Sequence, residues 1–357
     1  PRSTLFPYTT LFRSANALKK ADKDVDILFV GANGRMEMEK VPAAGYKIIG
    51  LPVAGFQRKL SLKNFSFLFK LIASLFKAKK IIADFKPDVV VGVGGYASGP
   101  VLKAAQNKGI PTLIQEQNSY AGVTNKLLSK KASKICVAYD GMEKYFPAKK
   151  IIKTGNPVRA DILNPALSRD EAFRFFELDP DMKTLLVIGG SLGARSINNC
   201  ICQNLDVLLR NKIQVIWQTG KTYFETAKLE ITKYNSRHLR MFEFIQRMDM
   251  AYKAADLVVS RAGACTISEI CLVKKPVILV PSPNVAEDHQ TKNALALSSR
   301  EAAIMVADKN ASSGLINQVI QLASHPADME KLSRNAGLMA LHDSDTRIAD
   351  EIFKLIR

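Results

Sequence analysis

Short runs of consecutive apolar residues alternate with longer amphipathic stretches along most of this chain. Such runs, rich in valine, isoleucine and leucine, are typical of strands buried on both faces of a parallel sheet. The predicted strands cover residues 25–31, 46–51, 88–92, 111–115, 133–137, 151–154, 185–188, 213–218, 239–244, 257–260 and 276–280. Apolar residues at helical spacing predict helices at residues 61–85, 101–107, 194–209, 248–254, 290–299, 311–323, 327–341 and 345–355, and another that begins at Ile267.

Alternating strands and helices predict an α/β fold, and a polar stretch at residues 161–169 reads as a linker between two such arrays. We therefore expect two Rossmann-like domains, of residues 15–158 and 159–338, whose parallel sheets face each other across a cleft. Residues 339–357 are predicted to form a C-terminal helix that packs back on the first domain. Residues 1–14 contain a near-repeat, Ser-Thr-Leu-Phe and Thr-Thr-Leu-Phe, and are interpreted as a non-native segment.

A glycine-rich turn follows the strand at residues 185–188 and precedes a predicted helix. Gly189, Gly190 and Gly193 let the backbone approach an anion closely, and the helix N-terminus favours negative charge there. The sequence thus predicts a diphosphate cradle. An ordinary turn between strand and helix is the alternative, because such turns are also rich in glycine.

Charge and cysteine content narrow the classes of partner. The chain carries 51 basic and 33 acidic residues, a net charge of +18, which favours nucleic acid, an anionic membrane or a phosphorylated substrate. No nucleic-acid-binding module signature is found, so no nucleic-acid partner is expected. The five cysteines form no C-x-x-C pair and no metal-ligand spacing with histidine, which predicts free thiols and no integral metal or cofactor. No apolar run is long enough to predict a membrane-spanning helix.

Six motifs follow one another in the chain, most of them at predicted strand ends. They are Gly-Gly-Tyr-Ala-Ser-Gly-Pro at 94–100, Glu-Gln-Asn at 116–118, Gly-Asn-Pro-Val-Arg at 155–159, Gly-Gly-Ser-Leu-Gly-Ala at 189–194, Arg-Ala-Gly-Ala-Cys-Thr-Ile-Ser-Glu at 261–269 and Asp-His-Gln-Thr-Lys-Asn-Ala at 288–294. With these motifs the chain resembles the MurG glycosyltransferases, which have the GT-B fold. The family moves N-acetylglucosamine from UDP-N-acetylglucosamine to the muramyl sugar of lipid I, which makes lipid II for peptidoglycan.

The resemblance implies a donor site whose residues, apart from Asn118, lie in the second domain. Ser191, with the glycines of its turn, would contact the UDP diphosphate, and Arg159 would be a cationic partner of the nucleotide. Glu269 would bind the ribose hydroxyls, and backbone groups of Ile245 would bind uracil. Asn118, Ala264 and Gln290 would hold the N-acetylglucosamine, and the other implied donor-binding residues are Cys265, Thr266, Ile267 and Ser268. Free Mg²⁺ near the diphosphate is left open.

Each of three donor-site residues also has a structural alternative. Arg159 would suit a surface salt bridge, and Glu269 would suit a capping box with Thr266, because Thr-Ile-Ser-Glu fits S/T-x-x-E. Gln290 would equally satisfy local backbone groups at a helix N-terminus.

The resemblance also implies an acceptor site in the first domain. The turn with Gly94, Gly95, Tyr96, Ser98 and Gly99 would receive the pyrophosphate of lipid I, and tight packing of strand and helix is the alternative. The family begins with a strand and a Gly-Gly-Thr-Gly-Gly-His loop, and the histidine of that loop, a candidate base, has no counterpart here. Glu116 is then the candidate catalytic base of an inverting transfer to the C4 hydroxyl.

Residues 56–87, from Phe56 to Pro87, combine six phenylalanines with eight lysines and arginines. The stretch is interpreted as a peripheral docking surface for the anionic cytoplasmic face of the membrane. The alternative is that the phenylalanines are core and the lysines a solvated face. Two rival functions remain at this point: a GT-B transferase with another acceptor, and a non-catalytic UDP-sugar-binding protein.

Overall fold

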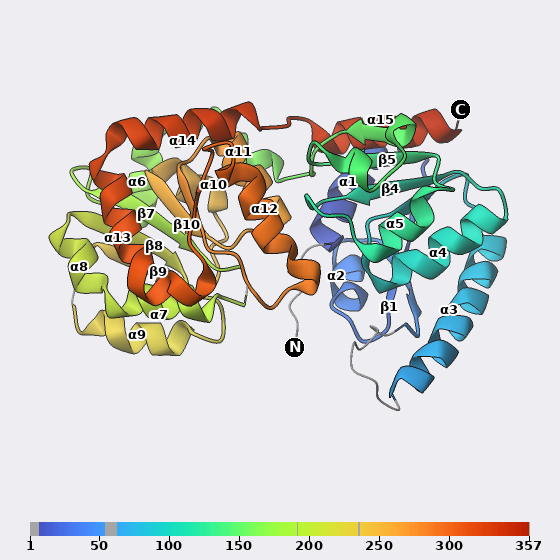
Figure 1. Ribbon diagram of the computed structural model, residues 1–357, viewed down its shortest axis with the longest axis horizontal. Helices are drawn as coiled ribbons and strands as arrows, with labels where there is room; N and C mark the ends of the chain where they lie inside the picture. The colour runs from blue at the N-terminus through green and yellow to red at the C-terminus, as the bar shows by residue number, and fades with distance from the viewer. Residues whose placement is uncertain (1–6, 54–62, 191, 235, 357) are drawn as a thin grey trace. The chain divides into compact units, whose positions relative to one another are not determined.

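The computed structural model describes residues 7–53, 63–190, 192–234 and 236–356 of the chain. They form two compact units, which we call the N-terminal unit (residues 7–158 and 343–356) and the C-terminal unit (residues 159–342). Each unit has helices packed around parallel strands (Figure 1), so the predicted α/β fold class is confirmed.

The N-terminal unit contains two parallel sheets, β1-β2 and β3-β4-β5-β6. Its strands are β1 Leu28–Ala32, β2 Lys47–Leu51, β3 Val90–Gly92, β4 Thr112–Glu116, β5 Lys134–Val137 and β6 Ile151–Lys153. Its helices are α1 Pro7–Ala21, α2 Glu37–Ala43, α3 Lys63–Phe85, α4 Gly95–Asn107, α5 Val123–Ser129 and α15 Ser344–Ile356, with 3-10 turns at Met142–Lys144 and Ala148–Lys150.

The C-terminal unit is built on one six-stranded parallel sheet in the order β12-β11-β10-β7-β8-β9. Its strands are β7 Lys183–Ile188, β8 Ile213–Gln218, β9 Leu239–Phe242, β10 Leu257–Ser260, β11 Val277–Leu279 and β12 Ile304–Met305. Its helices are α6 Arg169–Phe176, α7 Arg195–Gln203, α8 Leu205–Arg210, α9 Phe224–Thr232, α10 Met248–Ala254, α11 Ala264–Val273, α12 His289–Ser298, α13 Ala311–Ser324 and α14 Pro326–Leu338, with 3-10 turns at Ala160–Leu163, Ala286–Asp288 and Asp308–Asn310.

The first strand of the C-terminal unit lies in the middle of its sheet. The chain leaves β7, adds β8 and β9 on one side, and then crosses to add β10, β11 and β12 on the other. Ligands of doubly wound folds bind where the strand order reverses in this way, at the carboxyl end of the central strand. The glycine turn at residues 189–194 begins at that point.

The last helix, α15, belongs to the core of the N-terminal unit. Ile348 and Ile352 pack with Leu113 of β4 and Cys136 of β5, and α15 lies against α1 (Figure 1). Within the segment interpreted as non-native, α1 begins at Pro7, and the Phe12 ring lies 5.6 Å from the Phe29 ring.

Several predicted elements differ from the structure. The predicted linker at 161–169 runs into α6, where Ser168 and Glu171 form a capping box that the sequence analysis overlooked. The helix predicted at 194–209 is two helices, because α7 ends at Gln203 and α8 begins at Leu205. Helices α2, α5 and α9 and the two-residue edge strand β12 were not predicted. Among the described residues no helix has the length and apolar character needed to cross a membrane.

Candidate functional site

The turn that follows β7 has a conformation that only glycine readily adopts. Gly190 and Gly193 have φ values of 81° and 76°, and the Gly193 N–H donates to the Gly190 carbonyl oxygen at 3.0 Å. A Cβ on Gly193 would lie 2.0 Å from the carbonyl oxygen of Thr219. The turn therefore packs directly on the backbone that follows β8. Ser191, the predicted diphosphate contact, lies outside the described residues.

Two buried amide side chains hold this turn and the segments beside it. Gln218, at the end of β8, donates to the Gly190 carbonyl oxygen at 3.1 Å and accepts from the Ile245 N–H at 2.9 Å. Asn198 of α7 donates to the Thr219 carbonyl oxygen at 2.7 Å and accepts from Trp217 Nε1 at 3.1 Å. Neither amide was predicted. Because Gln218 engages the Ile245 N–H, the predicted uracil segment and the diphosphate turn are joined through one side chain.

Two helices begin at the same edge of the sheet without a side-chain cap. The N-cap residues are Ala194 for α7 and Gly263 for α11, and neither side chain accepts a hydrogen bond from the first turn. Uncapped N–H groups and the positive end of the helix dipole favour an anion. The first turn of α11 contains Ala264, Cys265 and Thr266, three of the predicted donor-binding residues.

Two further predicted residues of α11 are engaged within the unit. Ile267 is a core residue with 2% of its surface exposed, and Ser268 Oγ donates to the Ala264 carbonyl oxygen at 3.0 Å. Their side chains therefore stabilise the helix itself.

Glu269 lies in the second turn of α11, between a cation and a phenol. Its Oε1 is 3.7 Å from Arg159 Nε, and its Oε2 accepts a hydrogen bond from Tyr252 at 3.2 Å. Burial, followed by the nearby Glu269 carboxylate, raises the pKa of Tyr252 well above its ordinary value, so the phenol remains a donor. The capping-box alternative for Glu269 is wrong, because the helix begins at Ala264, ahead of Thr266.

An arginine, a serine and an aspartate brace the same edge of the sheet. Arg261, directly after β10, donates to the Val280 carbonyl oxygen at 3.0 Å and to Asp308 at 2.5 Å. It also donates to Ser196 Oγ at 3.0 Å, and Ser196 in turn donates to Asp308. This brace ties the start of α7, which follows the diphosphate turn, to the ends of β10 and β11. The motif at 261–269 contained Arg261, but no role was predicted for it.

Gln290 and Asn293 of α12 satisfy neighbouring backbone groups. Gln290 Oε1 accepts from the Ser282 N–H at 2.9 Å, and Asn293 Nδ2 donates to the Ala262 carbonyl oxygen at 3.3 Å. Both side chains are buried. The structural alternative stated for Gln290 is therefore realised, and its predicted contact with N-acetylglucosamine stays a prediction.

In the N-terminal unit, the predicted acceptor turn is largely helical. Gly94 is the N-cap of α4, with a φ of 84°, and the helix runs from Gly95 through Pro100. The prediction of a helix that begins only at residue 101 is therefore wrong. Tyr96 is 51% exposed, and the buried hydroxyl of Ser98 has no hydrogen-bond partner among the described residues. This hydroxyl oxygen is shielded from solvent and lies close to Gly92 at the end of β3, so an unpaired buried group marks the start of α4.

Glu116 ends β4 as a buried carboxylate that accepts four hydrogen bonds. Oε1 accepts from the Asn118 N–H at 3.1 Å and from Asn118 Nδ2 at 3.4 Å. Oε2 accepts from the Gly122 N–H at 3.0 Å and from Asn125 Nδ2 at 2.9 Å. Burial raises the pKa of Glu116 and outweighs these bonds, which act in the opposite direction. The carboxylate thus holds Asn118 and the loop before α5 in place.

A second buried amide network joins the ends of β4 and β6. Gln117 Nε2 donates to Gln115 Oε1 at 2.8 Å and to the Val93 carbonyl oxygen at 3.2 Å. Asn156, from the motif at 155–159, donates to the Gln117 carbonyl oxygen at 3.0 Å. Two of the six motifs, at 116–118 and 155–159, therefore meet in one hydrogen-bond network of the N-terminal unit, which also holds the residue directly before the motif at 94–100.

Helix α3 exposes an aromatic stripe opposite its buried face. Phe69, Ile72 and Phe76 are 66%, 44% and 67% exposed, and their spacing places them on one side of the helix. The exposed lysines of the described part of α3 are Lys70, Lys77, Lys79 and Lys80. The alternative that the phenylalanines are core is wrong for Phe69 and Phe76. Phe56 and the other residues of the stretch up to residue 62 lie outside the described residues.

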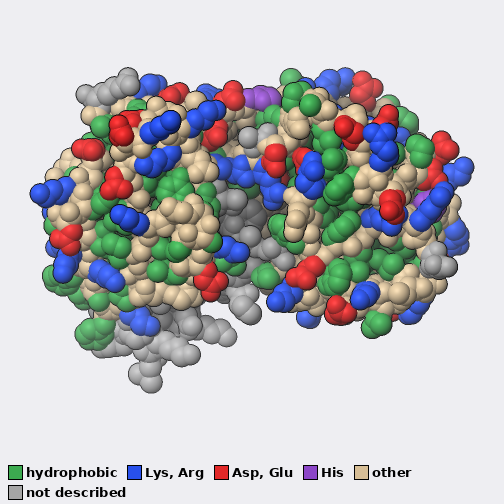
Figure 2. Space-filling view, turned by 180° about the vertical axis from the view of Figure 1, so that it is seen from behind, with side chains coloured by type: hydrophobic (Ala, Val, Ile, Leu, Met, Phe, Trp, Pro, Cys, Tyr) green, Lys and Arg blue, Asp and Glu red, His purple; other side chains and the backbone are tan. Residues whose placement is uncertain are grey.

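Basic side chains elsewhere are dispersed. On the face drawn in Figure 2, Lys and Arg side chains are interspersed with Asp and Glu side chains over both units. That face presents no continuous basic stripe of the kind that follows a nucleic-acid backbone.

Comparisons with known proteins match almost the whole chain. Residues 5–137 match the glycosyltransferase family 28 N-terminal domain, and residues 184–349 match the glycosyltransferase family 28 C-terminal domain. The UDP-N-acetylglucosamine--N-acetylmuramyl-(pentapeptide) pyrophosphoryl-undecaprenol N-acetylglucosamine transferase of Phocaeicola vulgatus is 57% identical over 352 residues, which cover 98% of this chain and 93% of the relative. The transferase of the same name from Parabacteroides distasonis is 56% identical over 352 residues, 99% of this chain and 95% of the relative. The crystal structure of MurG from Acinetobacter baumannii aligns with a TM-score of 0.78 at 26% identity, over 97% of this chain and 95% of that chain.

Proposed function

The chain belongs to the MurG family of glycosyltransferases, and on that premise we propose that it moves N-acetylglucosamine from UDP-N-acetylglucosamine to the C4 hydroxyl of the muramyl sugar of lipid I, which yields lipid II. The main support for binding of the donor, UDP-N-acetylglucosamine, is the turn at residues 189–194. It leaves the central strand at the reversal of strand order, and Gln218 fixes it from behind. An anion-binding turn in that position suits a sugar nucleotide.

Departure of UDP builds negative charge on the diphosphate, and the C-terminal unit offers fixed positive charge to meet it. The uncapped N-termini of α7 and α11 supply N–H groups, and Arg159 supplies a guanidinium. Charge stabilisation by groups that are already in place lowers the barrier without reorganisation. No group of three metal-ligating side chains occurs among the described residues. The proposal therefore assigns no resident metal and allows free Mg²⁺ at the diphosphate.

Glu269 is positioned to accept hydrogen bonds from the two ribose hydroxyls. Tyr252 holds Oε2, and Arg159 lies near Oε1, so the carboxylate has a fixed orientation before the nucleotide arrives. Because Tyr252 and Arg159 already restrict the Glu269 side chain, binding of the ribose costs less side-chain conformational entropy.

The reaction is an inverting displacement in which the C4 oxygen forms a bond to the anomeric carbon as the bond to the UDP oxygen breaks. A base takes the proton of the C4 hydroxyl. Because both oxygens of Glu116 already accept hydrogen bonds from Asn118, Gly122 and Asn125, its geometry favours positioning of the loop over proton abstraction. The acceptor pyrophosphate is assigned to the start of α4, where the buried Ser98 hydroxyl has no hydrogen-bond partner among the described residues.

We also propose that α3 docks the protein on the anionic cytoplasmic face of the cell membrane, where a lipid-linked acceptor is presented. The exposed Phe69 and Phe76 would enter the interface, and the flanking lysines would meet lipid headgroups. Lys79 already lies 5.6 Å from the centroid of the Phe76 ring, so the basic and aromatic groups form one surface.

The proposed acceptor is tested by offering the protein UDP-N-acetylglucosamine with either a lipid-pyrophosphoryl muramyl pentapeptide or free muramyl pentapeptide. We expect a disaccharide product only from the pyrophosphoryl acceptor. Equal rates with both acceptors would favour a GT-B transferase with a soluble acceptor. Donor binding without product from either would favour a non-catalytic UDP-sugar-binding protein.

A further inference from the structure

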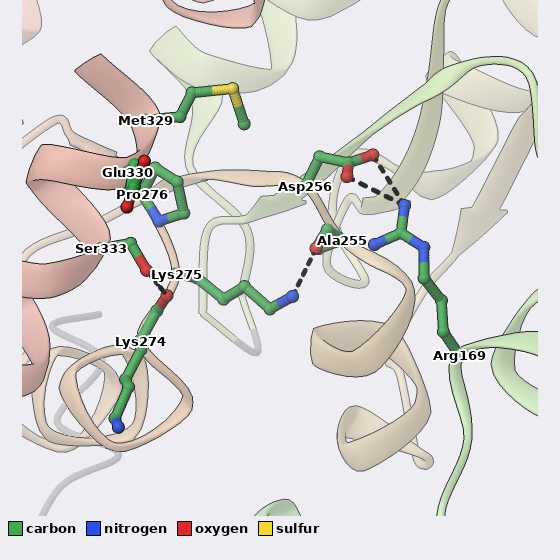
Figure 3. Close-up of a pocket in the computed structure, with 9 residues that line it drawn as sticks. All are labelled: Arg169, Ala255, Asp256, Lys274, Lys275, Pro276, Met329, Glu330 and Ser333. Atoms are coloured by element: carbon green, nitrogen blue, oxygen red, sulfur yellow. Dashed lines mark hydrogen bonds and ion pairs between the residues drawn. The ribbon is translucent and has the colours of Figure 1, made fainter. Parts of the chain in front are cut away.

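A hollow of about 230 Å³ lies at the amino-terminal edge of the sheet in the C-terminal unit, at the opposite end of the strands from the turn at 189–194. It opens beside the residues that directly precede β10 and β11. Its lining residues are Arg169, Ala255, Asp256, Lys274, Lys275, Pro276, Met329, Glu330 and Ser333 (Figure 3). Nothing in the proposed transferase reaction uses these side chains.

Lys275 extends into this hollow from the loop between α11 and β11. Its Nζ donates to the Ala255 carbonyl oxygen at 2.6 Å, which is its hydrogen-bond partner among the described residues. Figure 3 shows the Lys275 ammonium and the Arg169 guanidinium converging on the segment of Ala255 and Asp256 from opposite sides. The amine is thus held at one place, with a second cation close by.

The charged groups around Lys275 are of both signs. Asp256 accepts two hydrogen bonds from Arg169 Nη2, at 2.9 Å and 3.0 Å, so its charge is largely matched by that guanidinium. Arg169 and Lys253 repel the Lys275 ammonium, whereas Asp256 attracts it. Glu330 lines the hollow from α14, and Lys274 points away from Lys275 in Figure 3.

These surroundings make Lys275 a partly neutral amine near physiological pH. Burial, with the repulsion from Arg169 and Lys253, lowers the pKa of Lys275 to about 8. At pH 7.4 roughly 20% of such a group is the free amine, against about 0.1% of an ordinary lysine. The free amine is the nucleophilic form.

We propose that Lys275 is an acyl-acceptor site, modified by a small acyl phosphate whose phosphate group is held by Arg169. Asp256 engages Arg169 through Nη2, which leaves Nη1 and Nε as donors for the phosphate oxygens. The Lys275 nitrogen forms a bond to the acyl carbon, the bond from that carbon to the phosphate oxygen breaks, and the amine proton leaves with the phosphate. The products are an amide on Lys275 and inorganic phosphate, so no further reactant is needed.

The test is a time course of acetylation of the full-length chain by acetyl phosphate, with each modified lysine identified by mass spectrometry. Lys274 is the internal control, because it is the exposed neighbour of Lys275 in the sequence. We expect Lys275 to react about tenfold faster than Lys274 at pH 7.5, with a rate that levels off above a midpoint near pH 8. Equal or slower reaction of Lys275 would overturn the proposal.

A second experiment compares acetyl phosphate with an uncharged acetylating reagent, to distinguish recognition of the phosphate group from reactivity of the Lys275 amine alone. Because Arg169 also helps to lower the pKa of Lys275, Arg169→Gln should slow the reaction of Lys275 with both reagents. We expect the rate with acetyl phosphate to fall about tenfold more than the rate with an uncharged N-hydroxysuccinimide ester. Lys275→Arg identifies the modified peptide. If the wild-type protein shows fast reaction of Lys275 with the uncharged ester but not with acetyl phosphate, the site does not recognise acyl phosphates and the proposal is wrong.

Discussion

The side-chain amide of Gln218 donates a hydrogen bond to the carbonyl oxygen of Gly190 at 3.1 Å. The other end of the same amide accepts the N–H of Ile245 at 2.9 Å. One buried side chain therefore links the turn assigned to the diphosphate with the segment assigned to uracil, and the two halves of the nucleotide site are set at a fixed spacing.

Replacing Gln218 with methionine should weaken donor binding. Gln218→Met removes both hydrogen bonds and keeps an unbranched side chain of similar length, so we expect the KM for UDP-N-acetylglucosamine to rise about tenfold. Steady-state kinetics at saturating acceptor measure this. Gln214→Met is the matched control, because Gln214 is a buried glutamine on the same face of β8 that bonds to Asp179 and Thr184 at the other end of the strand. A similar rise of KM in the control variant would show that loss of stability, and not the link to Gly190, is responsible.

Gly193 should not tolerate even a methyl group. Gly193→Ala places a Cβ 2.0 Å from the Thr219 carbonyl oxygen at a φ of 76°, so the turn must move, and we expect donor binding to fall at least about tenfold. Titration of the protein with UDP, followed by calorimetry, measures the affinity. Gly314→Ala is the control, because Gly314 lies in α13 with open space around it; that change should raise the free energy of unfolding by about 0.5–1 kcal/mol. Unaltered UDP affinity in Gly193→Ala would contradict the assignment of this turn.

Glu116→Gln distinguishes a positioning residue from a catalytic base. Both oxygens of the Glu116 carboxylate accept hydrogen bonds from N–H groups. Glutamine would place an NH₂ group, which is a donor, opposite some of these donors, so we expect the free energy of unfolding to fall by about 1–3 kcal/mol. Burial raises the pKa of Glu116, so the folded protein favours the protonated carboxyl group. The contribution of Glu116 to the free energy of unfolding is therefore complete below about pH 4 and declines as the pH rises through the pKa of Glu116 in the folded protein. The stability difference between wild type and variant should therefore be largest at acidic pH in chemical denaturation.

The same variant gives a kinetic readout. If Glu116 positions the loop before α5, kcat/KM should fall while its pH profile keeps the wild-type shape. Disappearance of the acidic limb of that profile, with unchanged stability, would identify Glu116 as the base.

The aromatic stripe of α3 should carry membrane binding. Phe69→Ser with Phe76→Ser removes two largely exposed rings, and we expect flotation with vesicles that contain anionic lipid to fall about tenfold or more. Leu229→Ser is the control, because Leu229 is 70% exposed on α9 of the other unit. Binding that is equally strong on vesicles without anionic lipid, or that survives the double substitution, would remove α3 as the docking surface.

Elements with an uninterrupted apolar pattern were predicted closely. Strand β10 and helix α10 have the predicted bounds, and β8 does as well. The start of α4 was missed because glycines and Pro100 in its first two turns are typical of a loop. The structure nevertheless keeps Pro100 inside the helix, where it cannot donate a backbone hydrogen bond. Strand β12 was missed because two residues are too few to show the hydrophobic pattern from which a strand is predicted. The resemblance to the MurG family is confirmed by the match of both halves of the chain.

The residues that support the candidate site were the least predictable. Nothing local distinguishes Gln218 at a strand end, or Asn198 inside a helix, from surface amides. Their partners, Gly190 and Thr219, lie 28 and 21 residues away, so their roles depend on the order of the strands. Arg261 was inside a recognised motif, yet its contacts with Ser196 and Asp308 likewise exist only once β10 lies beside β7.

The most direct test of the proposed function is the product formed from UDP-N-acetylglucosamine and a lipid I analogue with this chain. Mass spectrometry and NMR of the isolated lipid would identify the new sugar and its linkage. We predict one N-acetylglucosamine added to the C4 oxygen of the muramyl sugar with the anomeric configuration inverted, and one UDP released for each sugar transferred. Release of UDP without a disaccharide, or a product with retained configuration, would contradict the account.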